Sequence, residues 1–476
     1  MRIILEWNDH IKEKIENRIA AMMAEARVPG LSLAVVKDNQ IIYARGFGSR
    51  NLKENLPATP DTLYGIGSCT KSFTALAIMQ LVERGKLDVQ DPVSKHLPRF
   101  KLKGKNGKQI TIHHLLTHSS GIPNLGTAEI LIRRMANLGE YFVPLSSIED
   151  FFLHINEAQE EIAAEPGERF YYSNEGYTLL GMIVERASGV SYENYVQENI
   201  LKPLKMDRST FDKEKFEKDS DVMVPYIVEA KGGEIKAIPS AHPFEKFVYA
   251  PGGLLSSVAE LAHYLIANMN GGIFENTRII DATLLSQMHK PYIKTGFHWF
   301  FNEEAKYGYG WMITENFFGH KIVEHGGNTG SSSAELAFMP DQKIGVAVAS
   351  NTGAGGLIYL TPVVIMALML GKDPEKDVPA LKAEKIMSML AGEYASYKGI
   401  HKVSVIKKGG LLYLESKEKS FEISAPLIPE KDDIENLKFY IVEAGGIRLP
   451  VEFEVGPKGE IDMYLERTRF HKVKTA

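Results

Sequence analysis

The sequence has very little cysteine and no long apolar run, and both shortages narrow the possible classes of protein. A single cysteine, Cys69, among 476 residues excludes an internal disulfide and any metal site built on several cysteines. The N-terminal residues lack the apolar core of a signal peptide, and no segment reaches the roughly 18–20 apolar residues of a membrane span. We therefore expect a cytoplasmic protein with no membrane partner.

The sequence also has no large excess of positive or negative charge. The formal net charge is −5, from 55 basic and 60 acidic residues, which gives no reason to expect a nucleic-acid partner. Apolar residues make up 44% and charged residues 24% of the chain, a balance typical of a globular protein with a large core. Glutamine is scarce beside abundant lysine and glutamate, which indicates a thermophilic source.

The order of the expected elements indicates an α+β fold. An amphipathic helix is predicted over residues 11–27, and the segment from residue 68 to residue 200 is mostly helical. Strands are predicted on both sides of this helical block, at 31–36, 41–45, 321–325, 334–339 and 344–349. We therefore expect one antiparallel sheet built from both ends of this segment and flanked by helices, with a helical subdomain inserted.

A charged, proline-bounded stretch at residues 371–379 predicts a boundary between two domains. We expect a first domain over 1–372, a linker over 373–387 and a second domain over 388–476. Short segments of alternating hydrophobicity, separated by glycine-containing turns, fill this last part: 403–406, 411–414, 447–455 and 460–465. This texture predicts a small antiparallel β-barrel.

The first candidate functional motif is Ser68-Cys-Thr-Lys71, at the start of a mostly apolar helix. A serine and a lysine three residues apart lie on one helix face, so hydroxyl and amine can touch. The helix N-terminus adds positive potential and free N–H groups, and burial should reduce the basicity of the lysine. Serine is also a favoured N-cap, and the spacing recurs at 404–407 and 416–419, so an ordinary helix start remains an alternative. We expect Cys69 to be a packing residue.

The second candidate motif is Tyr172-Ser-Asn174. A buried tyrosine near a lysine ammonium could ionise easily and carry a proton. The asparagine amide could hold the lysine and a substrate carbonyl together. Considered alone, an ordinary buried tyrosine is the commoner case.

The third candidate motif is His325-Gly-Gly-Asn328, which ends an apolar strand. Glycines after a strand-borne histidine let a substrate backbone lie close, as in strand addition. The histidine could bond the proton relay or a substrate carboxylate, and a purely structural histidine is the alternative. His118, followed by two serines, imitates a catalytic pair, but we expect it to hold a buried loop. No histidine or acidic cluster has metal-ligand spacing, and no glycine-rich loop has the form of a phosphate loop.

In this order, the Ser-x-x-Lys, Tyr-x-Asn and His-x-Gly motifs resemble the serine β-lactamase and penicillin-binding-protein superfamily. Segments 115–123, 172–181 and 251–257 are typical of its class C-like branch, which includes D-alanyl-D-alanine carboxypeptidases, D-aminopeptidases and esterases. The C-terminal segment resembles the lipocalin-like barrel appended to some members. Together the two parts are most similar to the archaeal self-compartmentalising serine peptidases of the CubicO group.

The resemblance implies a role for each matching position. Ser68 would be the acylated nucleophile, Lys71 and Tyr172 would share the general-base work, and Asn174 would orient Lys71 and the substrate. Which of Lys71 and Tyr172 removes the serine proton stays open.

The same resemblance assigns the third motif to substrate binding. The N–H groups of Ser68 and Asn328 would form the oxyanion hole, beside Gly327. His325 would belong to the catalytic group and stands where class C β-lactamases carry a lysine. A permanent cation for a β-lactam carboxylate is therefore missing.

The resemblance thus implies a serine peptidase that hydrolyses amide bonds of short peptides, including peptides with D-residues, without cofactor or metal. A carboxylesterase or weak β-lactamase of the same fold is one alternative, and a catalytically inert peptide-binding protein is another. The self-compartmentalising relatives imply a homo-oligomer with enclosed active sites.

Overall fold

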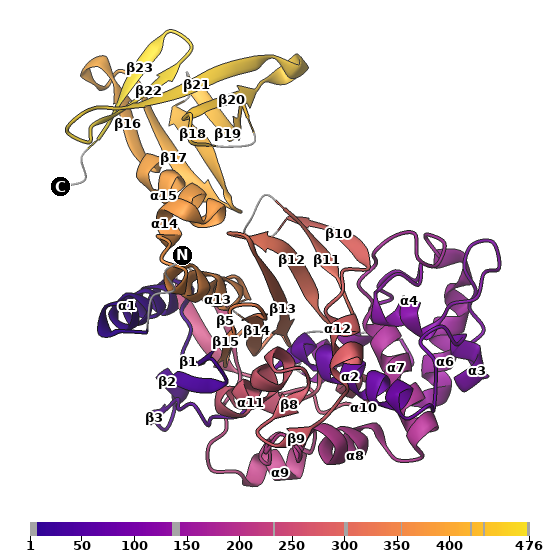
Figure 1. Ribbon diagram of the computed structural model, residues 1–476. Coiled ribbons are helices and arrows are strands. Elements are labelled where there is room, and N and C mark those ends of the chain that lie inside the picture. Colours follow the sequence, from indigo (N-terminus) through magenta and orange to yellow (C-terminus); the bar gives the residue numbers. More distant parts are fainter. Residues whose placement is uncertain are drawn as a thin grey trace. The chain divides into compact units, whose positions relative to one another are not determined.

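The computed structural model describes residues 7–135, 143–231, 234–298, 303–353, 355–418, 421–431 and 434–473. The chain divides into two compact units, residues 1–371 and residues 372–476 (Figure 1). The stretch 373–387, which we expected to form a linker, contains helix α14 (Pro374–Asp377) and most of helix α15 (Pro379–Leu390).

The first unit is built on a nine-stranded antiparallel sheet with the order β10-β11-β12-β13-β14-β15-β1-β2-β3 (Figure 1). The first three strands of the chain lie beside the last strand of the unit, so both ends of this segment contribute to one sheet. This confirms the predicted α+β arrangement. The strands are β1 (Gly30–Lys37), β2 (Gln40–Asn51), β3 (Leu56–Pro57), β10 (Ile293–His298), β11 (Glu304–Tyr307), β12 (Met312–Phe317), β13 (His320–Asn328), β14 (Ser333–Met339) and β15 (Ile344–Ser350).

The centre of the sheet is covered on both faces. Every residue of β14 and β15 is buried, and successive side chains of a strand point to opposite faces. Helices α11 (Val258–Met269) and α13 (Gly355–Met369) pack on these two strands, and helix α1 (Asp9–Ala26) packs on α13. Strand β13, which carries His325, therefore pairs with a strand that is covered by helices on both faces of the sheet.

The helical block between the two groups of strands carries the other candidate motifs. Its main helices are α2 (Thr70–Glu83), α4 (Ile112–Leu116), α5 (Thr127–Met135), α6 (Ile148–Glu157), α7 (Asn174–Ser188), α8 (Tyr192–Val196), α9 (Lys213–Lys218) and α10 (Lys246–Gly252). None of the helices in the described ranges is both long enough and apolar enough to cross a membrane.

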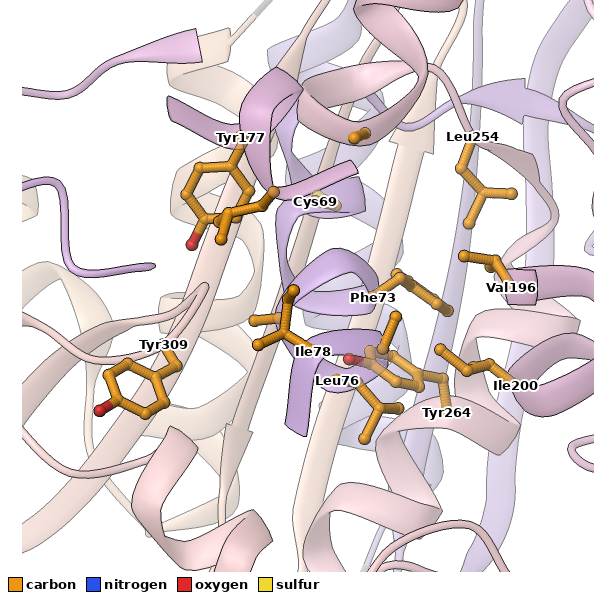
Figure 2. Packing of buried hydrophobic residues seen from close by; sticks show 14 of the residues in the cluster. Cys69, Phe73, Leu76, Ile78, Tyr177, Val196, Ile200, Leu254, Tyr264 and Tyr309 are labelled. Atoms are coloured by element: carbon orange, nitrogen blue, oxygen red, sulfur yellow. The ribbon is translucent and has the colours of Figure 1, made fainter. Parts of the chain in front are cut away.

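Helix α2 forms the middle of the core of the first unit. All its residues from Thr70 to Leu81 are buried, as expected of a helix that is apolar on every side. Figure 2 shows Phe73, Leu76 and Ile78 of this helix among side chains from other elements. The ring of Phe73 stacks on Tyr264 of α11, with 3.9 Å between ring centroids. The start of α2, which carries Ser68 and Lys71, is thus anchored by the core.

The second unit contains a closed antiparallel barrel of eight strands, which confirms the predicted barrel. Residues of a strand such as β22 alternate between buried and partly exposed positions, because one face of each strand lines the barrel core. The strands are β16 (Gly392–Ser396), β17 (Lys402–Lys408), β18 (Leu411–Glu418), β19 (Phe421–Pro429), β20 (Lys438–Val442), β21 (Arg448–Val455), β22 (Ile461–Leu465) and β23 (Thr468–Lys472).

The two further copies of the Ser-x-x-Lys spacing start on barrel strands. Ser404 and Lys407 lie on β17, where a spacing of three residues places them on opposite faces; Ser404 is partly buried and Lys407 is exposed beside Glu384. Ser416 lies on β18 and is buried, whereas Lys419 lies outside the described residues. Neither serine begins a helix, so only Ser68 combines the spacing with a helix N-terminus.

Candidate active site

Ser68 lies where the chain enters helix α2. The short 3-10 helix η1 (Gly67–Cys69) continues directly into α2. Gly67 has a φ of +52°, and a Cβ on it would lie 2.5 Å from the backbone nitrogen of Asn328. Glycine is therefore required at this position. Ser68 itself is partly exposed while the residues around it are buried, so its hydroxyl is accessible on a fixed backbone.

Lys71 contacts Ser68 as the spacing predicted. Its Nζ lies 3.0 Å from Ser68 Oγ, 2.7 Å from Asn174 Oδ1 and 2.8 Å from the carbonyl oxygen of Pro251. The side chain is fully buried, and burial lowers the pKa of Lys71 to about 7, against the opposing effect of nearby carboxylates. A neutral amine is thus accessible near neutral pH, and it can accept the proton of the Ser68 hydroxyl.

Tyr172 lies beside this pair. Lys71 Nζ is 4.7 Å from the centre of the Tyr172 ring. Burial raises the pKa of Tyr172 well above its ordinary value, although a hydrogen bond with Ser68 acts in the opposite direction. The expectation that Tyr172 ionises easily is therefore wrong, because the loss of solvation outweighs the hydrogen bond with Ser68. The hydroxyl of Tyr172 therefore keeps its proton near neutral pH.

His118 holds the loop that carries Tyr172, as expected. The backbone N–H of Tyr171 donates to His118 O at 2.7 Å, and the N–H of Ser173 donates to His118 Nδ1 at 3.1 Å. The two bonds fix the backbone on both sides of Tyr172, and the rings of His118 and Tyr172 lie 4.3 Å apart. Burial lowers the pKa of His118 well below its ordinary value, so the ring stays neutral and accepts the Ser173 bond.

Asn174 occupies the first residue of helix α7, and the preceding Ser173 caps that helix by accepting a bond from the N–H of Gly176. The Asn174 Oδ1 accepts from Lys71, and its Nδ2 donates to Glu129 at 3.3 Å. The amide is therefore held from both ends, and it fixes the position of the lysine.

His325 lies on β13 and is buried. Its Nδ1 donates to Gly326 O at 2.7 Å, so its Nε2 accepts from the hydroxyl of Tyr307, 2.9 Å away. Burial, with a smaller contribution from Lys71, lowers the pKa of His325 to about 3. The ring is neutral and supplies no cation to the site. Its partner, Tyr307 of β11, was not predicted, although the run Tyr-Gly-Tyr-Gly-Trp at 307–311 is an unusual sequence signal.

Gly327 brings strand β13 against the start of α2. A Cβ on Gly327 would lie 1.9 Å from Ile66 O and 2.7 Å from Ser68 N. The N–H groups of Ser68 and Asn328 consequently lie in one small region, as an oxyanion hole requires. Beyond Glu324, the edge of β13 that faces β12 has no strand partner in the described ranges, because the β12 pairing ends at Met312 and Glu324.

A cavity of about 420 Å³ opens at this edge. Its lining comes from several elements and combines the predicted residues with others that the sequence did not indicate: Ser68, Glu129, Tyr172, Asn174, Phe297, Met312, Glu324, His325, Gly326, Asn328, Glu335 and Tyr359. Glu335 interrupts the mostly apolar strand β14, and Glu324 follows the apolar pair Ile322-Val323 of β13; a glutamate in such a context is the signal that could have drawn attention to them.

Cys69 is a buried packing residue, as expected. Its thiol donates to the carbonyl oxygen of His325 at 3.0 Å, and burial raises its pKa well above the ordinary value of a thiol. In the part of the chain that the structure describes, no three His, Cys, Asp or Glu side chains are grouped so as to hold a metal ion.

Comparison with known proteins gives the class of the chain. Residues 15–358 match the beta-lactamase family, and residues 374–471 match the Pab87 octamerisation domain. The chain therefore belongs to the beta-lactamase family, whose members include penicillin-binding proteins and are serine hydrolases. This confirms the superfamily inferred from the three motifs.

Individual relatives agree with this class. Protein flp of Staphylococcus aureus (strain MW2) is 28% identical over 342 residues, which are 71% of this chain and 63% of that protein. Penicillin-binding protein 4* of Bacillus subtilis (strain 168) is 26% identical over 320 residues, or 66% of each chain. The chain thus spans less than two thirds of the length of Protein flp.

Two solved structures are also similar. The octameric penicillin-binding protein homologue from Pyrococcus abyssi has a TM-score of 0.88 and 41% identity, covering 97% of this chain and 99% of that one. The penicillin-binding protein from Bacillus halodurans has a TM-score of 0.58 and 26% identity, covering 74% of this chain and 99% of that one. The likeness to the Pyrococcus protein includes both units.

Proposed function

We propose that the chain is a serine peptidase that hydrolyses amide bonds of short peptides through an acyl-enzyme on Ser68. The observation that carries this proposal is the 3.0 Å contact between Ser68 Oγ and a buried Lys71 Nζ whose pKa is lowered to about 7. A serine needs such a neighbouring base to become a nucleophile at neutral pH.

In the proposed acylation, the Ser68 hydroxyl gives its proton to neutral Lys71 as Oγ attacks the substrate carbonyl carbon. The oxyanion accepts bonds from the N–H groups of Ser68 and Asn328. The C–N bond then breaks, and Tyr172 passes a proton to the leaving amine while Lys71 replaces it. This route favours Lys71 over Tyr172 as the base, because the pKa of Tyr172 is raised.

Deacylation repeats these steps with water in place of the serine hydroxyl. Water adds to the ester carbonyl, the bond between the carbonyl carbon and Oγ breaks, and Ser68 regains its proton. We infer that the substrate lies extended along the open edge of β13 beyond Glu324, where β12 no longer pairs with the strand. The reaction that we propose needs no cofactor.

We propose further that the chain forms a homo-octamer with enclosed active sites. The Pyrococcus protein that covers 97% of this chain is described as octameric, and residues 374–471 match an octamerisation domain. The barrel unit also exposes large apolar side chains, including Tyr397 (71% exposed), Ile400 (65%) and Ile447 (58%). Exposed apolar surface of this kind is typical of an interaction face.

Mass spectrometry of a mixed panel of L- and D-containing peptides tests the proposed activity, with Ser68→Ala as the comparison. We expect cleavage by the natural chain and a loss of turnover on the order of 10⁶-fold in the variant, as for other serine nucleophiles. Cleavage that survives Ser68→Ala would contradict the assigned nucleophile. Hydrolysis of p-nitrophenyl esters without cleavage of any peptide would identify a carboxylesterase instead.

A further inference from the structure

The cavity beside Ser68 contains two buried glutamates on one face of the sheet. Gly326 of β13 pairs with Glu335 of β14, and Glu324 pairs with Ala337. The two glutamates are therefore diagonal neighbours on adjacent strands, a relation that places residues about 7–8 Å apart. Glu324 is 8% and Glu335 is 3% exposed, and both side chains line the cavity.

These carboxyls have no counter-ion within the described residues. Neither forms an ion pair there, and Oε1 of Glu335 is buried without a hydrogen-bond partner. The side chains that line the cavity include no lysine and no arginine. Burial raises the pKa of both groups, that of Glu324 to about 7, and Glu324 raises the pKa of Glu335 further. A buried acidic group without a partner is costly, so a persistent one suggests a ligand.

Gly326 and Glu335 lie in close contact where both line the cavity. A Cβ on this glycine would lie 2.7 Å from Glu335 Oε2 and 2.6 Å from a ring carbon of Tyr359. Any larger residue would therefore collide with the carboxyl and with the ring. Glycine at this position lets the backbone of β13 lie directly against the Glu335 carboxyl, at the cavity that Ser68 also lines.

We propose that Glu324 and Glu335 form a subsite that binds a cationic group of the substrate next to the scissile bond. This proposal rests on the proposed peptidase function. Gly327 lies against Ser68 N, and the adjacent Gly326 faces Glu335. An extended peptide advances about 3.3 Å per residue, so the cation belongs one or two residues from the bond that Ser68 attacks.

The charge of this subsite is opposite to that of a β-lactamase site. His325 is neutral and supplies no cation for a substrate carboxylate, whereas a bound cation would lower the raised pKa values of the two glutamates and stabilise their negatively charged forms. The cation can be the α-ammonium of a peptide cleaved near its N-terminus, or a lysine or arginine side chain. Both sources present the same chemistry to the carboxylates.

Four matched peptides separate these sources. The N-terminus is free or acetylated, and the residue beside the scissile bond is lysine or norleucine, which has a similar length without the charge. We expect kcat/KM to be about 10- to 100-fold higher for one cationic form than for the neutral peptide, the usual effect of a charge-assisted hydrogen bond. The arm in which the gain occurs identifies the α-ammonium or the side chain as the ligand.

Variants that remove the charge of Glu324 or Glu335 test whether these residues cause the higher kcat/KM of the cationic peptide. Glu335→Gln and Glu324→Gln should each abolish most of the ratio between the cationic and the neutral peptide. Glu315→Gln, at an exposed position of the same sheet on β12, should preserve both the ratio and the basal rate. Acylation of Ser68 by a neutral p-nitrophenyl ester reports whether each variant has folded.

The outcomes for this subsite and for the peptidase activity are distinguishable. Ser68-dependent cleavage of all four peptides at similar rates would overturn the cationic subsite and leave the peptidase intact. A gain that persists in both glutamine variants would also overturn it. If no peptide is cleaved, the same four forms made as p-nitrophenyl esters decide the charge preference, because ester hydrolysis still acylates Ser68.

Discussion

The two units of this chain treat buried polar groups in opposite ways. In the first unit, Lys71, Glu324 and Glu335 are ionisable residues in the interior, and polar atoms such as His118 Nε2 and Glu335 Oε1 are buried without partners. In the described part of the barrel unit, the buried polar residues are Ser396 and Ser416 alone, and no buried side-chain nitrogen or oxygen lacks a partner.

This difference distinguishes the first unit, which contains the candidate active site, from the barrel unit, whose interior is apolar. Buried polar groups without partners reduce stability, and they persist where a substrate or a chemical step uses them. The barrel instead has an apolar interior, including Leu414 and Phe453, and exposed apolar residues on its outside. We infer that selection on the barrel acts on packing and assembly, whereas in the first unit it acts on charge and proton transfer.

The largest difference should appear when the same motif is altered in both units. Lys71→Ala should lower kcat by about 10²–10⁴-fold, the usual contribution of a general base. Lys407→Ala removes the lysine of the matched Ser-x-x-Lys spacing on β17 and should leave turnover unchanged. Steady-state kinetics on a cleaved peptide measures both, and a small effect of Lys71→Ala would reject its role as base.

The pH dependence of kcat/KM tests whether the buried Lys71 of the first unit acts as the base. The pKa of Lys71 is lowered to about 7, and only the deprotonated amine can accept the serine proton. We therefore expect kcat/KM to rise as the pH increases through about 7 and then to level off. Activity that falls with increasing pH between 6 and 8 would contradict this assignment.

A smaller effect should follow from opening a cavity in the barrel. Phe453 is 4% exposed on β21, and Phe453→Ala should destabilise the barrel by about 3–5 kcal/mol. Val455→Ala, at a 45% exposed position of the same strand, should change stability by less than about 0.5 kcal/mol. Calorimetric unfolding measures both. An unchanged transition in Phe453→Ala would show that its burial contributes little.

Replacing one exposed residue of the barrel should change the oligomeric state but hardly the stability. Ile400→Asp alters a 65% exposed residue beside η4 (Tyr397–Gly399), so the free energy of unfolding of a single barrel should change by less than about 0.5 kcal/mol. The mass measured by light scattering should nevertheless fall. Lys398→Gln changes the charge of the same turn without adding polarity to the apolar patch and should keep the mass. An unchanged mass in Ile400→Asp would exclude this turn from the contact between copies.

Local patterns allowed much of the fold to be predicted. The alternation in 447–455 and 460–465 indicated β21 and β22, because a period of two places one face of each strand inside the barrel. The contact of Ser68 with Lys71 was also predictable, because a spacing of three residues is a property of a single helix. These features depend on neighbours in the sequence.

Other features depend on elements that are distant in the sequence. Tyr307 meets His325 only because β11, β12 and β13 are adjacent in the sheet, and Glu335 faces Gly326 only through the register of β13 and β14. The state of Tyr172 was predicted wrongly for a related reason. Its pKa depends on how much water surrounding segments exclude, and no local pattern specifies that quantity.

The sequence by itself determined the helix start that pairs Ser68 with Lys71, the central strands of the sheet, part of the barrel strands and the family to which the chain belongs. Each of these follows from periodicity or from short motifs with fixed spacing. Only the tertiary structure decided that His325 is neutral, that the predicted lowering brings the pKa of Lys71 to about 7 and that two glutamates share the cavity of the serine. The physical reason is that solvation and charge at a buried site are summed over side chains from many separate segments.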